Sequence, residues 1–192
     1  MMRKFIRNFV VIGVVSLLFI LTGCSNSANS EVTDQKINEF LVSYYEDLAD
    51  TENKIMSYEE ESKSFVGLEV FLVEKQDANY VVYVWIFQES YFKVNETTIS
   101  ISGGYSTPCK VVIKDNGGKY EVISSEMPGD SETEAEDIMR LFPVDVQKRL
   151  DTLVEDGTLD KLIGIVEEKA LSYFGAEFID YCPECDFEDI DE

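Results

Sequence analysis

Apolar residues recur at spacings of three and four in the chain from residue 37 onward. This period places them along one face of a helix. Thr33 or Asp34 can cap such a helix at its amino end. The pattern stops near Asp50–Asn53, so we predict one amphipathic helix between these points. The positions on its apolar face are Ile37, Phe40, Leu41, Tyr44, Tyr45 and Leu48.

From Ser64 onward, β-forming residues replace the helical period. Phe65–Val73 and Tyr80–Phe87 are two such runs, and Gln76–Asn79 between them has the composition of a turn. The second run reads YVVYVWIF and is apolar throughout. Such a run predicts a long central strand or a strand that is buried on both faces. Ordinary core packing under the first helix is the preferred role for Tyr83, Trp85 and Phe87, and a ligand cleft lined by them is the alternative.

Two further strands are expected after these. Thr97–Ser102 alternates between apolar and polar residues, Gly103–Gly104 permits a bulge or bend, and the strand resumes at Lys110–Lys114. Asp115–Gly118 reads DNGG, a hairpin signal because Asn-Gly tolerates the positive φ that tight turns require. Lys119–Ser124 is then the returning strand.

Helical spacing returns in the last third of the chain. Ser131 and Glu134 have the spacing of a capping box, which predicts a short helix. Pro143 suits the first turn of the next helix, a break is expected at Gly157, and Gly175 can close the last helix. The inward positions should be Val146, Leu150 and Leu153 in the second helix and Leu159, Leu162, Ile163, Val166, Ala170 and Tyr173 in the third.

Strands followed by helices indicate the α+β class, with the helices on one face of an antiparallel sheet. We predict a helix packed on a four-stranded antiparallel sheet, followed by two or three carboxyl-terminal helices. This single domain should span residues 33–178, and an acidic tail should follow at residues 179–192.

The amino terminus has the layout of a secretory signal peptide. Met1–Asn8 is basic, and Phe9–Ile20 is almost entirely apolar but shorter than the run of about 20 residues that spans a bilayer. Leu21–Cys24 reads LTGC and resembles the lipobox of bacterial lipoproteins. The resemblance implies that residues 1–23 are removed and that Cys24 carries the lipid. A signal anchor that stays in the membrane is the alternative.

Residues 24–32 are small and polar, which predicts a flexible tether between the lipid and the domain. Such a protein lies on the outer face of the cytoplasmic membrane, with the membrane as its first partner.

Charge and composition exclude several function classes. The 192 residues include 38 Asp and Glu, 16 Lys and Arg and no His, for a net charge of −22. Strong acidity argues against binding nucleic acid. The absence of His excludes His-based triads and His metal sites. A hydrophobic fraction of 45% is too high for a disordered chain.

Four segments resemble, in their order, a small extracellular domain of Firmicute proteins that is often attached to membrane metallopeptidases related to the β-lactam sensor-transducers. They are SGGYSTPCKVVI (Ser102–Ile113), NGGKYEV (Asn116–Val122), MPGD (Met127–Asp130) and DIMRLFPVDVQKRL (Asp137–Leu150). The resemblance implies a Gram-positive host and an accessory or sensing domain with a cystatin-like or NTF2-like outline. Peptidase activity is not implied, because the zinc motif of those enzymes contains His.

The cysteines offer a second chemistry. Cys182 and Cys185 form a CPEC motif in the acidic tail, where neighbouring carboxylates should raise thiol pKa values. We favour a disulfide, either within the motif or between Cys109 and one of the two, because the extracellular environment is oxidising. Reduced thiols and a metal or redox site are the alternatives, although no second pair of zinc ligands is present.

Acidic residues crowd the segment from Glu126 to Asp137. It lacks the spacing of an EF-hand loop, so we favour a solvated face over a Ca²⁺ site. A catalytic carboxylate pair has no specific support among 38 acids. We therefore expect no catalytic residue, metal or cofactor. The predicted function is non-enzymatic binding or sensing at the cell surface, with a protein partner or small ligand. A thiol-redox or metal-binding protein that uses the CPEC tail is the alternative.

Overall fold

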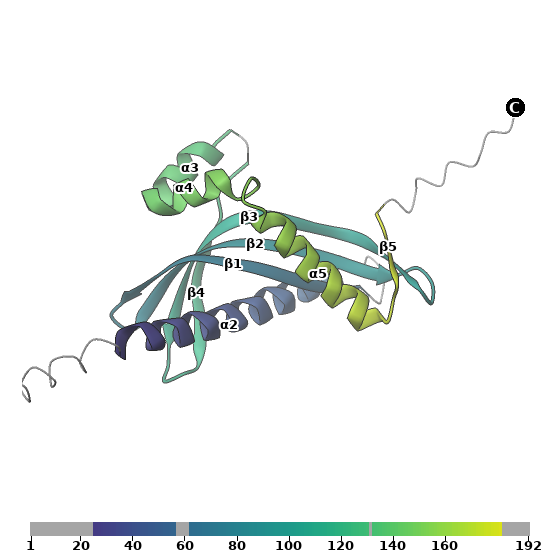
Figure 1. The fold of residues 1–192 in the computed structure, drawn as a ribbon, viewed down its shortest axis with the longest axis horizontal. Coiled ribbons are helices and arrows are strands. Elements are labelled where there is room, and N and C mark those ends of the chain that lie inside the picture. Colours follow the sequence, from purple (N-terminus) through teal and green to yellow (C-terminus); the bar gives the residue numbers. More distant parts are fainter. Residues whose placement is uncertain (1–24, 57–61, 131, 182–192) are drawn as a thin grey trace, which may run out of the picture. The chain divides into compact units, whose positions relative to one another are not determined.

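The computed structural model describes residues 25–56, 62–130 and 132–181 (Figure 1). It confirms the α+β class, with a helix packed on a mostly antiparallel sheet and further helices after it. None of the described helices is both long and apolar enough to cross a membrane. The elements are α2 (Ser25–Met56), β1 (Lys63–Gln76), β2 (Asn79–Lys93), β3 (Thr98–Asp115), β4 (Tyr120–Glu126), α3 (Glu134–Leu141), α4 (Val144–Thr152), α5 (Thr158–Phe174) and β5 (Phe178–Asp180).

The chain divides into two compact units, one up to Lys36 and one from Ile37 onward. The sheet, the later helices and α2 from Ile37 belong to the second unit. Helix α2 begins at Ser25, earlier than the expected cap at Thr33 or Asp34. Residues 25–32 are therefore helical where we expected a flexible tether. Extending an existing helix costs far less than nucleating one, so Ser, Asn and Ala can continue it without an apolar period.

The sheet has five strands instead of the predicted four. Strands β1, β2, β3 and β4 follow one another in antiparallel order. β5 pairs in parallel with the first residues of β3, so that Ile99 lies opposite Ile179. With three residues, β5 is too short for a periodic signal, and it extends the fold past the predicted boundary at residue 178. The acidic tail therefore begins later than expected.

Strand β3 is continuous through the two glycines, with a register shift beside them. Ser90 lies opposite Gly103 and Tyr91 opposite Ile101, which leaves one extra residue on β3. A Cβ on Gly104 would overlap the carbonyl oxygen of Gln88. This close approach explains the glycine at that position. The register shift beside it confirms the predicted bulge.

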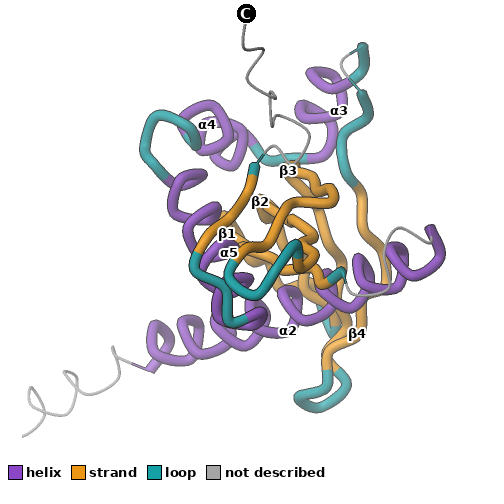
Figure 2. The backbone as a smooth tube through the Cα atoms, turned by 90° about the vertical axis from the view of Figure 1, so that its right-hand side faces the viewer, coloured by secondary structure: helices purple, strands orange, loops and turns teal. Residues whose placement is uncertain are grey.

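Helices cover both faces of the sheet (Figure 2). Ile37, Leu41 and Tyr45 of α2 pack on one face, together with Val66, Val82, Val84, Ile86, Val111 and Ile113. On the other face, α5 packs on Phe65 and Phe87, and α3 and α4 pack on Val81 and Tyr83. The prediction that all helices share one face was wrong. A central strand that is apolar on both faces, as β2 is, needs a layer on each side.

The same arrangement corrects the role of the β2 aromatic residues. Tyr83, Trp85 and Phe87 do share a face, but they pack under the carboxyl-terminal helices and not under α2. The ring centroids of Tyr83 and Phe142 lie 6.0 Å apart. These side chains are core, as preferred, and they do not line a cleft with α2.

Several helix details differ from the predicted stripes. Leu48 is 39% exposed and Tyr173 is 62% exposed, whereas Ala49 is buried. Helix α3 begins at Glu134 with Thr133 at its N-cap and no capping side-chain hydrogen bond, and Ser131 lies outside the described residues. The predicted capping box, which needs Ser131, therefore stays a prediction. Gly175 closes α5 with φ of 64°, as expected.

Side chains from both helical layers cover the outer edge of β1. Glu46 of α2 accepts a hydrogen bond from the Val66 N–H at 3.1 Å. Lys169 of α5 donates to the Val66 carbonyl and to Glu46, both at 2.9 Å. Arg149 of α4 donates to the Phe71 carbonyl at 2.8 Å. The edge is thereby blocked against pairing with another strand.

Candidate functional site

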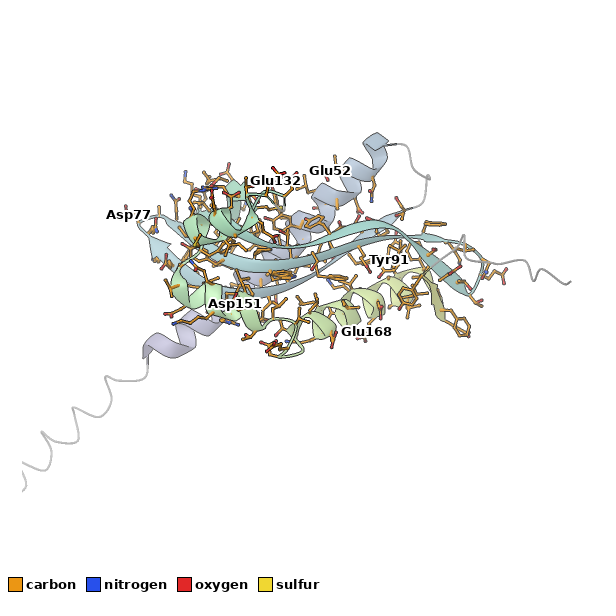
Figure 3. The ribbon with its side chains drawn as sticks, turned by 90° about the horizontal axis from the view of Figure 1, so that it is seen from above. Glu52, Asp77, Tyr91, Glu132, Asp151 and Glu168 are labelled. Carbon is orange, nitrogen blue, oxygen red and sulfur yellow. The ribbon has the colours of Figure 1, made fainter. Side chains whose placement is uncertain are left out.

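A pocket of about 290 Å³ lies at the carboxyl-terminal end of α2, between this helix and strands β2 and β3. Glu52, which Figure 3 labels, comes from the helix side of the pocket. The described residues that line it are Ala49, Glu52, Asn53, Gln88, Ser90, Ser102, Gly103, Gly104 and Tyr105.

The pocket exists because the inner face of β2 changes from apolar to polar along the strand. Val82, Val84 and Ile86 point toward α2 and are buried in the apolar core. The next residues of the same alternation are Gln88 and Ser90, which are 4% and 3% exposed. Burying such groups is costly unless they are hydrogen-bonded, so a polar network forms at this end of the core.

Four side chains form this network. Asn53 Nδ2 donates to Ser64 Oγ at 3.1 Å and to Ser90 Oγ at 2.9 Å. Gln88 Nε2 donates to Ser90 Oγ at 2.9 Å. The oxygens of Ser64 and Ser90 lie 2.9 Å apart. Ser90 is therefore the centre of the network.

The number of protons and lone pairs decides which hydroxyl donates in the bond between Ser64 and Ser90. Ser90 Oγ accepts from both Asn53 and Gln88, which uses its two lone pairs, so its own proton goes to Ser64. The hydroxyl of Ser102 donates to the Ser90 carbonyl at 3.1 Å. Asn53 and Gln88 take part in this network through their side-chain nitrogen atoms. Their amide oxygens make none of these bonds.

Among the described residues, no buried side-chain nitrogen or oxygen lacks a hydrogen-bond partner. Asn53 and Gln88 use N–H groups inside the network, and both residues also line the pocket.

Tyr105 and Glu52 complete the wall. Burial, followed by the neighbouring Cys109 and Glu52, raises the pKa of Tyr105 to about 12. The phenol therefore keeps its proton at neutral pH and remains a hydrogen-bond donor. The other lining side chains with polar atoms are amides, hydroxyls and one carboxylate, a set suited to holding a ligand by hydrogen bonds.

A second polar cluster lies on the opposite face of β2. Tyr91 is fully buried and donates a hydrogen bond to Glu89, while Tyr181 donates to Glu167 at 2.7 Å. Burial raises the pKa of Glu89, the bond from Tyr91 lowers it, and the charge of Glu167 raises it again. Burial and Glu89 together raise the pKa of Tyr91. The hydroxyl of each tyrosine is thus committed to a carboxylate.

An open hollow of about 600 Å³ runs along the outer side of α5. Its described lining comes from α5 and the two residues after it, and includes Glu167 and Glu168. Figure 3 labels Glu168 on this helix. A hollow formed by one helix and its end gives a ligand few converging groups, so the α2 pocket is the better candidate site.

The predicted cysteine sites are only partly within the described residues. Cys24, Cys182 and Cys185 lie outside them. Cys109 is a free thiol and fully buried under α2. Its sulfur lies 3.1 Å from Ser125 Oγ and 3.5 Å from the hydroxyl of Tyr45, and burial raises its pKa. The proposed bridge from Cys109 would need Cys182 or Cys185, which lie outside the described residues, so it stays a prediction. A reagent or partner thiol could reach the buried sulfur of Cys109 only if the core opened.

The acidic segment is organised by hydrogen bonds within the protein. Asp137 accepts from the Gly129 N–H at 2.9 Å and from Arg140 at 2.9 Å, and the first of these is the main reason why its pKa is lowered. Arg140 also pairs with Glu126 at 3.5 Å. The described part of the chain holds no group of three or more His, Cys, Asp or Glu arranged to bind a metal ion.

Sequence analysis missed the residues of the pocket. A usable signal was present in β2, where alternate positions change from Val82, Val84 and Ile86 to Gln88 and Ser90. The helix residues Glu52 and Asn53 gave no such signal, because polar residues at the end of a helix are common.

Comparison of the chain with models of protein families, with curated proteins and with solved structures found no match. The lipobox resemblance and the resemblance to the Firmicute domain therefore stay predictions.

Proposed function

We propose that the protein is a lipid-anchored lipoprotein whose α+β domain binds a ligand outside the cytoplasmic membrane without transforming it. The observation that carries the proposal is the pocket at the end of α2, where hydrogen-bonding groups converge on a cavity of about 290 Å³. Among the described residues of its lining, no hydrogen bond joins a nucleophile to a base, which is the usual minimum for covalent catalysis.

The amino-terminal sequence supports the membrane anchor. The apolar run before Cys24 supports export. A lipid on Cys24 would hold the domain at the outer face of the membrane. A Gram-positive host is part of the proposal and rests on the resemblance alone.

Substitution of Cys24 tests the anchor. Cys24→Ala should leave the signal peptide attached and the protein without lipid, because no thioether can form, and the intact mass of the detergent-extracted protein measures both changes. The doubly substituted Cys182→Ala/Cys185→Ala protein is the thiol control and should be processed and lipidated like the unaltered protein. A Cys24→Ala protein that is still processed and lipid-modified would contradict lipidation at Cys24.

Recovery of a bound small molecule tests the pocket. The full-length protein should be extracted in detergent, denatured, and its released small molecules compared by mass spectrometry with those of Ser102→Trp, which fills the pocket mouth. Ser124→Trp, at an exposed position of β4 outside the pocket, is the control. A compound that is enriched with the unaltered protein and the control, and lost with Ser102→Trp, is the expected result. Equal recovery from all three proteins would count against the pocket as the binding site.

A further inference from the structure

We infer that the α2 pocket selects a small ligand that carries an ammonium group. This inference rests on the proposed binding function and names the chemistry of its ligand. Four steps lead to it: the balance of donors and acceptors in the pocket, its charge, its size and its aromatic wall.

Acceptor oxygens outnumber free donors among the described side chains of the lining. The N–H groups of Asn53 and Gln88 that form hydrogen bonds are used inside the network. The proton of Ser102 is used on the Ser90 carbonyl, so its oxygen remains as an acceptor. Glu52 adds a carboxylate, which accepts only, and Tyr105 adds one hydroxyl donor. A ligand with N–H groups satisfies Ser102 and Glu52, whereas the charge of Glu52 repels a carboxylate or phosphate.

Charge decides between an ammonium group and a neutral polyol. Glu52 is the only charged residue among the described residues of the lining. The whole chain carries −22, so its field attracts cations and repels anions. A divalent metal ion is a poor occupant, because it prefers several carboxylates and the described lining supplies one.

Size and the aromatic residue narrow the class further. A cavity of about 290 Å³ lies at the lower end of the range for organic ligands, so the occupant is no larger than a monosaccharide or a short amine. Tyr105 lines the pocket with an aromatic side chain, and aromatic rings attract cations. Ammonium has three donors in a compact group and suits this combination of oxygens and ring.

The test compares matched pairs of probes on the full-length protein in detergent. Glucosamine against glucose, and ethanolamine against ethylene glycol, differ in the amine alone, and glucose 6-phosphate is the anionic probe. Binding is followed by calorimetry. We expect saturable binding of the two amines and at least tenfold weaker binding of the neutral and anionic probes.

Glu52→Gln removes the charge without changing shape, and because Glu52 is exposed we expect about a fivefold loss of amine affinity. Asp47→Asn is the matched control, since it removes one carboxylate from an exposed position of the same helix outside the pocket. The affinity of Asp47→Asn for the two amines should stay within twofold of that of the unaltered protein. Thermal unfolding should show that both variants are folded.

Each other outcome overturns the inference in a distinguishable way. If glucose and ethylene glycol bind as tightly as the amines and Glu52→Gln has no effect, selection of ammonium is wrong while a binding function stands. If Asp47→Asn weakens amines as much as Glu52→Gln does, the effect is a general field and the pocket assignment fails. If no probe binds, the ligand class is wrong, and the released-compound experiment decides separately whether the pocket binds anything.

Discussion

Single residues at the end of the sheet hold two polar clusters on opposite faces of β2. Gln88 and Ser90 face α2, whereas Glu89 and Tyr91 face α5. The alternation of a strand places neighbours in sequence on different faces, and the bulge beside Ser90 occurs where these clusters meet. The geometry of both clusters therefore depends on a few backbone positions.

Gly104 is the most constrained of these positions. Gly104→Ala should lower the free energy of unfolding by about 1–3 kcal/mol, because the added Cβ would overlap the Gln88 carbonyl oxygen in the neighbouring strand. Gly164→Ala is the control, since nothing lies within 4 Å of a Cβ there and α5 should gain about 0.5–1 kcal/mol. Urea unfolding of both variants measures the difference. Equal stability of the two variants would contradict the close approach.

Glu89 should make stability depend on pH. Burial raises its pKa, so the folded chain holds this proton more tightly than the unfolded chain does. The resulting stabilisation is present below the unfolded pKa and is lost as pH rises through the folded pKa. Glu89→Gln should therefore gain stability relative to the unaltered protein between pH 4 and pH 8, measured by urea unfolding.

Glu167→Gln tests the smaller contribution of a neighbouring charge to the raised pKa of Glu89, beside the main contribution of burial. Removing the nearby like charge should lower the pKa of Glu89, which carboxyl NMR titration can follow. Glu168→Gln is the control on the exposed side of α5 and should leave the pKa of Glu89 in place. A Glu89→Gln protein whose stability keeps the same pH dependence as the unaltered protein would exclude Glu89 as the source.

At the scale of elements, β1 is held from both sides through its backbone. Glu46 and Lys169 come from different helices, yet both bond to Val66 and to each other. This small network ties α2 to α5 across the edge of the sheet. Arg149 of α4 likewise bonds to the β1 backbone, at the Phe71 carbonyl. It also forms an ion pair with Glu69 of β1 at 3.0 Å.

Loss of Glu46 should be costly for this reason. Glu46→Ala leaves the Val66 N–H and Lys169 without this acceptor, and we expect a loss of about 1–3 kcal/mol in the free energy of unfolding. Asp145→Ala breaks the highly exposed pair with Lys148 and should change stability by less than about 0.5 kcal/mol. Denaturant unfolding compares the two. A similar, small effect of both variants would mean that water replaces Glu46 at the edge.

The extent of each element was predicted with uneven success. The β3–β4 hairpin and the closing glycine of α5 follow from local conformational demands, and the structure has both. β2 continues past Phe87 to Lys93, and α2 extends at both ends, because neighbouring strands and helical propagation carry an element beyond its apolar core. The sequence contains no local signal for where such extension ends.

At the scale of the whole molecule, one sheet separates two apolar layers. Leu41 of α2 is fully buried on one face, and Leu162 of α5 is 1% exposed on the other. Strand β2 contributes side chains to both layers, with Val82 and Val84 on one side and Val81 and Tyr83 on the other. Loss of either layer would expose one face of this central strand to water.

We therefore expect the domain to unfold cooperatively. Leu41→Ala and Leu162→Ala should each lower the free energy of unfolding by about 2–5 kcal/mol, whereas Val154→Ala, at a side chain that is 70% exposed, should change it by less than about 0.5 kcal/mol. Fluorescence of Trp85, which lies on the α5 face, and far-UV circular dichroism should give one coincident transition. Separate transitions for the two signals would show that the layers unfold independently.

The sequence by itself determined the order of the elements up to α5, the α+β class and the hairpin turn, because each follows from local spacing or local backbone demands. It offered burial of Tyr80–Phe87 on both faces as one of two alternatives, beside a long central strand. The tertiary structure decided which face each helix covers, the pairing of β5 with β3, the burial of Cys109 and the meeting of α2 with Gln88 and Ser90 in a pocket. The period of apolar residues shows which face of a helix or strand is buried. Which other element packs on that face depends on contacts between segments far apart in the chain. The candidate site consists of such contacts, and this is why it became visible only in three dimensions.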